Sequence, residues 1–101
     1  MDGKVSAVVG SHTHVPTADT QILDGGTAYQ TDAGMCGDYN SIIGANPAGP
    51  INNFLGKEPR MHIKPTEGEA TLCGTFIETD DNTGLAKSIT SVRVGGHLGE
   101  I

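Results

Sequence analysis

Two histidines separated by one residue are the strongest candidates for chemistry in this chain of 101 residues. His12 and His14 lie in the stretch Gly10-Ser11-His12-Thr13-His14. In extended backbone, side chains at positions i and i+2 lie on the same side, so both imidazoles can face one point or two adjacent points. Imidazole is the commonest side-chain ligand for metals in proteins. We therefore interpret His12 and His14 as candidate metal ligands.

A short apolar segment precedes the histidines and must position them. The stretch Val5-Ser6-Ala7-Val8-Val9 has four apolar residues, which predicts a short strand buried on both faces. Gly10 and Ser11 then allow a sharp turn. Open α/β sheets collect their ligands at the carboxyl ends of strands, where this turn lies. A bare His-x-His pair also occurs by chance on protein surfaces, and its position after a buried strand is what favours a metal site.

The net charge of the chain limits the classes of molecule that it is expected to bind. The net charge is −6, from twelve acidic and six basic residues, and the basic ones are scattered from Lys4 to Arg93. Duplex nucleic-acid surfaces need clustered Lys and Arg, so this class of partner is not expected. An acidic protein can still act on a phosphate when metal ions supply the positive charge.

Size and cysteine content indicate a small intracellular domain. A chain of 101 residues with fifteen glycines buries a modest core, so its independent stability is doubtful. Cys36 and Cys73 lack a C-x-x-C spacing, and the sequence has no signal peptide or membrane-length apolar run. We expect two free thiols in a cytoplasmic protein that does not bind membranes.

A glycine-punctuated loop is the second candidate wall of the site. Residues 20–23 and 27–31 favour strands and are joined by Asp24-Gly25-Gly26, which predicts a hairpin. The loop of residues 32–37 follows its second strand. Asp32 is then either a carboxylate near the metals or a solvated turn residue, and the residues alone leave both alternatives open.

The rest of the chain reads as supporting structure. Asp38 can cap a short helical turn through Ile43. Asn46-Pro47 begins a helix. Its apolar residues are spaced for one packing face, and Gly56 ends it; these residues are Ile51, Phe54 and Leu55.

The last third of the chain is predicted to be β-rich. A strand is expected at residues 60–63 and a long hairpin at residues 70–94, with Leu72 and Phe76 on one face and Cys73 and Thr75 on the other. Gly74 marks a bulge or a close backbone approach. We expect His62 and His97 to be ordinary surface histidines.

A cupin is one alternative for the histidine pair. Cupins also use His-x-His, followed by a carboxylate and a glycine, and Asp19 and Gly26 fall near those places. However, Ser6 replaces the expected glycine, and Asn52 stands where the third histidine belongs.

A closer resemblance is to the calcineurin-like metallophosphoesterases, which end in a Gly-x-His-x-His motif. The match extends over nearly the whole chain and is most specific in the first forty residues, where it resembles the bacterial YmdB-like branch. The matching segments are residues 2–15, 17–19, 26–29, 31–35, Gly37, residues 51–55, Glu67-Gly68 and Leu72-Cys73-Gly74.

The resemblance implies a two-metal phosphodiesterase that hydrolyses 2′,3′-cyclic nucleotides. By the superfamily pattern, His12 ligates one metal and His14 the other, and the metals are iron, manganese or zinc. Two cations about 3.5–4 Å apart clamp a phosphodiester and stabilise its leaving oxygen. Asp32 would orient an imidazole through that ring's other nitrogen. No catalytic acid or base is assigned in this segment.

The implied fold is α/β, an α/β/β/α sandwich of which residues 1–101 form the C-terminal, β-rich part of a single domain. The remaining family ligands precede the matched segment, so we expect an incomplete fold that binds metal weakly and is inactive alone. The expected partners are a small phosphodiester substrate and other copies of the chain. A non-catalytic binding or structural module, associating through its hairpin, is the alternative from another class.

Overall fold

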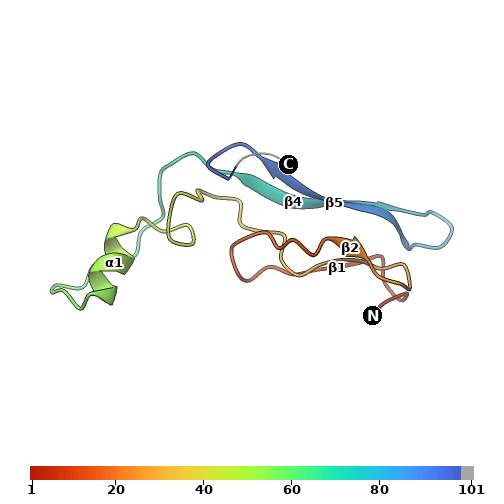
Figure 1. Ribbon diagram of the computed structural model, residues 1–101, viewed down its shortest axis with the longest axis horizontal. Helices are drawn as coiled ribbons and strands as arrows, with labels where there is room; N and C mark the ends of the chain where they lie inside the picture. Colours follow the sequence, from red (N-terminus) through yellow and green to blue (C-terminus); the bar gives the residue numbers. More distant parts are fainter. Residues whose placement is uncertain (99–101) are drawn as a thin grey trace.

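The computed structural model of this chain describes residues 1–98. The molecule is elongated, measuring 60 × 26 × 17 Å, and its radius of gyration is 17.5 Å. A compact domain of this size has a radius of gyration of about 13 Å. Figure 1 shows the reason: the strands gather at one end of the molecule and the helix stands at the other.

The first sheet has three short strands, β1 (Ala7–Val9), β2 (Gln21–Ile22) and β3 (Ala28–Gln30), in the order β1-β3-β2. β1 and β3 are parallel, and β2 and β3 are antiparallel. The turn between β2 and β3 is closed by a bond from the Leu23 amide to the Thr27 carbonyl, 2.9 Å long. This confirms the predicted hairpin around Asp24-Gly25-Gly26.

The predicted burial of the first strand on both faces is wrong. β1 covers only the last three residues of the predicted stretch, and Val8 and Val9 are 38% and 40% exposed. Burial on both faces requires a layer on each side of a sheet. In the part of the chain that the structure describes, β1 pairs with β3 along one edge, and the valine side chains remain at the surface.

A long antiparallel hairpin, β4 (Leu72–Thr79) and β5 (Ala86–Val94), forms the second layer and lies along the first sheet (Figure 1). Leu72 and Phe76 are exposed on its outer face, whereas Cys73 is buried, as the alternation predicted. The bulge or close backbone approach expected at Gly74 is wrong, because the register is continuous there and no atom lies within 4 Å of the position that a Cβ would occupy. The irregularity lies at Glu78–Thr79, where β4 enters the 80–84 loop.

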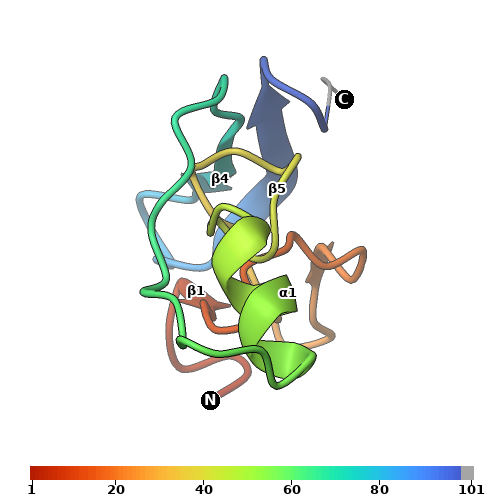
Figure 2. The ribbon, with the colours of Figure 1, turned by 90° about the vertical axis from the view of Figure 1, so that its left-hand side faces the viewer.

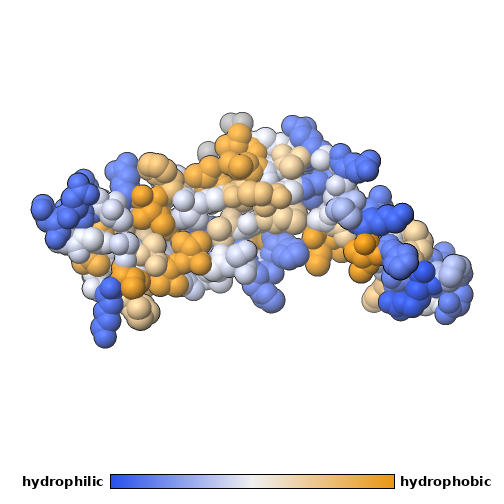
Figure 3. Space-filling model, turned by 180° about the vertical axis from the view of Figure 1, so that it is seen from behind, coloured by the Kyte–Doolittle hydropathy of each residue, from blue (hydrophilic) through white to orange (hydrophobic). Residues whose placement is uncertain are grey.

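Polar side chains join the two layers. Gln30 is fully buried; its amide nitrogen donates to the Thr17 carbonyl at 3.2 Å, and its amide oxygen accepts from the Thr75 hydroxyl at 2.8 Å. The other large, fully buried side chains are also polar, namely Thr27, Asp32 and Thr71. Large apolar side chains instead remain exposed, and Figure 3 shows them as separate apolar clusters along the molecule.

The single helix of the described residues, α1 (Ala48–Phe54), begins after Asn46-Pro47 as predicted. The Asn46 side-chain oxygen accepts from the Ala48 amide at 3.0 Å, and Gly56 leaves the helix with φ +69°. The helix was expected to pack through its apolar face, but Phe54 is 89% exposed, and Ile51 and Leu55 are exposed too. Viewed along the long axis, α1 stands in front of the sheets and away from them (Figures 1 and 2).

Two further expectations are corrected by local hydrogen bonds. Residues 38–43 form turns rather than a helical turn, because the Asp38 carboxylate accepts from the Asn40 amide at 2.8 Å and Ile42 pairs with Ala45. Residues 60–63 do not form a strand. The Asn53 side chain occupies both backbone groups of Met61, with two bonds of 2.9 Å, so this extended segment has a side chain as its partner.

Both cysteines are free thiols, as predicted; Cys36 is exposed and Cys73 is buried. Residues 1–98 include no helix with the length and hydrophobicity needed to cross a bilayer.

Candidate metal centre

Residues 10–14, which we call the histidine turn, follow directly after β1 and lie beside the loop that follows β3. The Gly10 amide donates to the Gln30 carbonyl and the Ala33 amide donates to the Gly10 carbonyl, both at 3.0 Å. A Cβ on Gly10 would lie 2.1 Å from the Thr31 carbonyl oxygen, so only glycine allows the two chains to approach this closely. Because β1 and β3 are parallel, their carboxyl ends bring the two predicted walls of the site together.

Asp32 fixes the backbone between the two histidines. Its Oδ2 accepts from the His12 amide at 2.7 Å and from the amide and hydroxyl of Thr13 at 2.5 and 2.8 Å. Its Oδ1 accepts from the Gly34 amide at 2.9 Å. The bond from Gly34, followed by those from His12 and Thr13, holds the pKa of this buried carboxyl well below its usual range. Asp32 is therefore a carboxylate that positions the turn through its backbone.

This arrangement differs in detail from the role expected of Asp32. The family resemblance suggested a contact with an imidazole ring, whereas the four hydrogen bonds described above reach backbone groups and the Thr13 hydroxyl. Thr13 was not a predicted site residue. The sequence gives little indication of its role, because its hydroxyl bonds to Asp32, which lies nineteen positions away.

His14 has its ring held by a backbone carbonyl. Its Nδ1 lies 3.0 Å from the Ile43 oxygen. A carbonyl oxygen only accepts, so Nδ1 carries a proton, and in the neutral ring the lone pair is then on Nε2. Metal-ligating histidines are commonly oriented in this way. His14 also has a φ of +69°, a left-handed backbone that is uncommon outside glycine.

Ile43, the partner of His14, is also left-handed, with φ +44°. It is the first central residue of a tight turn, in which the Ala45 amide donates to the Ile42 carbonyl at 2.8 Å. Glycine and asparagine usually occupy such positions, because a β-branched side chain is strained there. Both ends of the hydrogen bond from His14 to Ile43 thus have unfavourable backbone conformations, a pattern typical of functional sites.

A cavity of about 180 Å³ lies beside this hydrogen bond. Tyr39 supports its wall by donating to the Met35 carbonyl at 2.8 Å and accepting from the Met35 amide at 2.7 Å. Burial, together with the neighbouring Cys73 thiol, raises the pKa of Tyr39 to about 12, so the phenol stays neutral at physiological pH. The lining residues are His14, Val15, Met35, Tyr39, Ser41 and Ile43.

The donor set fits part of a metal centre. His12 and His14 are exposed imidazoles on one fixed turn, and Nε2 of His14 keeps its lone pair. Within residues 1–98, however, no group of three or more His, Cys, Asp or Glu side chains is arranged to hold a metal ion. The histidine pair therefore supplies a fraction of the ligands that a transition metal requires.

The residues of the cupin alternative do not gather at the histidines. The Asp19 carboxylate accepts from the hydroxyls of Thr17 and Thr31, and these bonds, Thr31 first, lower its pKa. Asn52 lies in α1 and donates to the Pro59 carbonyl at 3.2 Å. His62 and His97 are exposed elsewhere, beside α1 and beside Asp38 respectively.

Comparison with known proteins gives consistent results. The profile of a family described as "YmdB-like protein" matches residues 1–92. A relative from Bacillus subtilis strain 168, named 2′,3′-cyclic-nucleotide 2′-phosphodiesterase, is 45% identical over 93 residues, which are 92% of this chain and 35% of that protein.

Two solved structures share the fold. A crystal structure of a novel phosphatase from Mycoplasma pneumoniae matches with a TM-score of 0.84 and 42% identity, over 92% of this chain and 33% of that one. A hypothetical protein from Thermus thermophilus matches with a TM-score of 0.81 and 39% identity, over 91% of this chain and 35% of that one. The mixed α/β fold seen here therefore corresponds to about a third of each larger structure.

Proposed function

Because this chain belongs to the YmdB-like protein family, we propose that it is the histidine-bearing part of a metal-dependent phosphodiesterase that acts on 2′,3′-cyclic nucleotides. The reaction and substrate are suggested by the name of the Bacillus subtilis relative. The observation that carries the proposal is the turn that Asp32 clamps between the two imidazoles. A solvated surface pair would not need a buried carboxylate to fix its backbone.

The proposed roles follow the geometry. His12 would hold one metal ion and His14 the other. When bound, the metals would neutralise charge on the phosphodiester and its leaving oxygen. Asp32 keeps the two imidazoles on one turn, and the Ile43 carbonyl holds the proton of His14 on Nδ1, so Nε2 would be the nitrogen available to a metal. Imidazole suits iron, manganese and zinc, so all three are candidates.

We further propose that the 101-residue chain has little activity by itself. The chain spans about a third of the relatives that it matches, and residues 1–98 contain no third ligand beside the histidine pair. The missing ligands would come from the rest of the family domain. Turnover of 2′,3′-cyclic AMP by the purified chain, above that of a metal-only control, would contradict this part of the proposal.

A chimera tests the main proposal. The 93-residue segment of the Bacillus subtilis protein that aligns with this chain is replaced by the corresponding residues of this chain. We expect hydrolysis of 2′,3′-cyclic AMP. His12→Ala and His14→Ala should each lower kcat/KM by at least about 100-fold, since losing even a supporting partner of a ligand costs 10–100-fold.

The matched control in the chimera is His97→Ala, which removes an exposed histidine beside Asp38. This variant should retain full activity. A folded chimera that is inactive, or one in which the His12 and His14 variants behave like the His97 variant, would refute the proposal.

A further inference from the structure

The charge of this acidic chain is unevenly distributed. Residues 57–64, which we call the basic strap, contain Lys57, Arg60 and Lys64 and a single acid, Glu58, for a net charge of +2. The rest of the chain contains three basic and eleven acidic residues, for a net charge of −8. Half of the basic side chains thus lie in eight consecutive residues, a concentration that their overall spread from Lys4 to Arg93 conceals, and His62 lies among them.

The basic strap is held against α1 by hydrogen bonds to its backbone, and these bonds do not use its charged side chains. Asn53 bonds both the amide and the carbonyl of Met61 at 2.9 Å, and Asn52 donates to the Pro59 carbonyl at 3.2 Å. Gly49 is buried beneath the strap, and a Cβ there would lie 2.9 Å from the His62 carbonyl oxygen. The strap therefore has a defined path over the helix.

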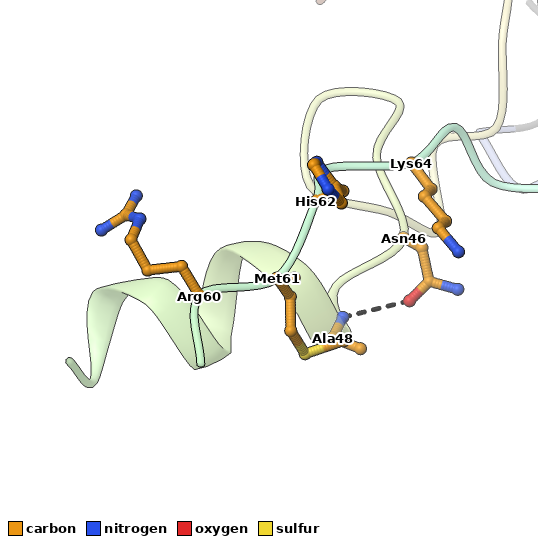
Figure 4. Close-up of a pocket in the computed structure, with 7 residues that line it drawn as sticks. Asn46, Ala48, Arg60, Met61, His62 and Lys64 are labelled. Atoms are coloured by element: carbon orange, nitrogen blue, oxygen red, sulfur yellow. Dashed lines mark hydrogen bonds between the residues drawn. The ribbon is translucent and has the colours of Figure 1, made fainter. Parts of the chain in front are cut away.

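A cavity of about 390 Å³ lies between the basic strap and the start of α1. Figure 4 shows Arg60, Met61, His62 and Lys64 following one another along the strap, with Asn46 and Ala48 below Lys64. In an extended segment, Arg60 and Lys64 are separated by about 13 Å. Arg60, His62 and Lys64 thus border the cavity along the strap, with the apolar Met61 between Arg60 and His62.

A short hydrogen-bonded segment connects the residues that line this cavity to the turn that holds His14. The Asn46 amide donates to the Lys64 carbonyl at 2.8 Å, and the Thr66 amide donates to the Gly44 carbonyl at 3.1 Å. Gly44 follows Ile43, whose carbonyl holds the His14 ring. Asn46 is three positions after Ile43, so their Cα atoms are at most about 11 Å apart. A ligand with one end at the histidines can therefore extend toward the strap.

We infer that the basic strap binds the 5′-side nucleotides of a short single-stranded RNA whose 2′,3′-cyclic phosphate end lies at the histidine turn. This inference rests on the proposed function and extends its substrate class from mononucleotides to oligonucleotides. Lys64 and Lys57 pair with backbone phosphates, and the flat groups of Arg60 and His62 stack on unpaired bases. These flat groups favour RNA over an anionic lipid surface, which needs only positive charge.

Binding of labelled oligonucleotides by the 101-residue chain tests this inference without any hydrolysis. The probe is a 5′-fluorescein uridine hexanucleotide ending in a 2′,3′-cyclic phosphate, measured by fluorescence anisotropy without metal, with 2′,3′-cyclic UMP as competitor. We expect the hexanucleotide to bind well above the mononucleotide. Arg60→Gln with Lys64→Gln should weaken binding about tenfold and lower the salt slope of log affinity by about 0.7, because only Lys64 of these two residues pairs with a phosphate.

The matched control is Lys4→Gln with Lys87→Gln, which removes the same charge from exposed positions outside the strap. It should leave affinity within about twofold. Equal losses in the two double variants, equal affinity for hexanucleotide and mononucleotide, or no binding would overturn the inference. Tighter, strap-dependent binding to vesicles containing phosphatidylserine would overturn it in favour of a lipid surface.

The two proposals fail in distinguishable ways. Without metal, a hexanucleotide with a plain 3′-hydroxyl should bind the chain as well as the cyclic form, because the strap contacts only the 5′ side. An inactive chimera together with strap-dependent RNA binding would refute the proposed hydrolysis alone, whereas an active chimera without such binding would refute the strap alone.

Discussion

The sheet body (β1–β5) and the helix lobe (residues 46–64) are fixed by contacts of different range. In the sheet body, the bonds that position the histidine turn join residues far apart in sequence: Asp32 to His12 over twenty positions, and Gln30 to Thr75 over forty-five. In the helix lobe, Asn53 reaches Met61 over eight positions. The histidine turn therefore requires the folded sheets, whereas the strap can form with its own helix.

The two regions nevertheless share one principle. Both use polar side chains to satisfy backbone groups, and neither has a large apolar core among the described residues. Hydrogen bonds contribute about 1 kcal/mol each, and a buried group that loses its partner costs about 1–3 kcal/mol. Substitutions of these polar groups and of the glycines that allow close contact should therefore have larger effects than substitutions of exposed apolar residues.

The largest effect is expected from Asp32→Asn, which tests the dependence of the histidine turn on the sheet body. The amide cannot accept from all the donors that Asp32 Oδ1 and Oδ2 bind, so the turn should loosen. Loss of such a supporting group lowers metal affinity about 10–100-fold. Calorimetric titration of the chain with Zn²⁺ measures this, and Asp81→Asn in the exposed loop is the control. Unchanged Zn²⁺ affinity would mean that Asp32 is not needed for the turn.

The next largest effect is expected from Gly49→Ala, which tests the helix lobe. The new Cβ would meet the His62 carbonyl at 2.9 Å, and overpacking of this kind costs about 1–3 kcal/mol. Amide exchange at residues 60–64 should speed up while exchange in β4 and β5 is unchanged. Gly74→Ala, which has open space around it, should be nearly neutral. Faster exchange throughout the chain would show that the lobe and the sheets unfold together.

A gain in stability of about 1 kcal/mol is expected from Ile43→Asn, because asparagine tolerates the left-handed turn position far better than isoleucine. The substitution keeps the backbone carbonyl that holds His14. Urea denaturation measures the gain, and Ile42→Asn, at the neighbouring position without positive φ, is the comparison. A loss of stability in the Ile43 variant would show that its side chain makes contacts that outweigh the strain.

A smaller, pH-dependent effect is expected at Asp38, where the two regions meet. The Thr66 hydroxyl, then the Asn40 amide, lowers the pKa of this carboxyl. Because the folded-state pKa lies below the unfolded value of about 3.9, its contribution is present above that pH and is lost as pH falls through the folded-state pKa. Urea denaturation at a series of acidic pH values measures this contribution. In Asp38→Asn the free energy of unfolding should fall less steeply as pH decreases, whereas in Asp24→Asn it should fall as in the unmodified chain. The same pH dependence in the two variants would contradict this.

The smallest effect is expected from Phe54→Ser, a change of less than about 0.5 kcal/mol, because the ring is 89% exposed on α1. Thermal denaturation of the isolated chain measures it, with Ile51→Ser as a second exposed position on the same helix. A loss of about 2 kcal/mol or more would show that this apolar face is covered in solution.

The features that the sequence predicted correctly depend on local signals. The Asp24-Gly25-Gly26 turn and the Asn46-Pro47 helix start each lie next to the element that they define. The strand expected at residues 60–63 failed because a side chain, Asn53, replaced the strand partner. The hydrogen bonds from backbone amides to Asp32 could likewise not be predicted from the sequence, since they depend on the parallel pairing of β1 with β3.

The buried amide of Gln30 has a consequence for how the hairpin finds its place. Its two ends are oppositely polar, and they are matched by the Thr17 carbonyl on one side and the Thr75 hydroxyl on the other. Sliding β4 by one residue would present Gly74 or Phe76 instead, and the amide oxygen would lose its donor in a place without water. Gln30 thus favours a single position of the hairpin against the first sheet, the one in which both ends of its amide are hydrogen-bonded.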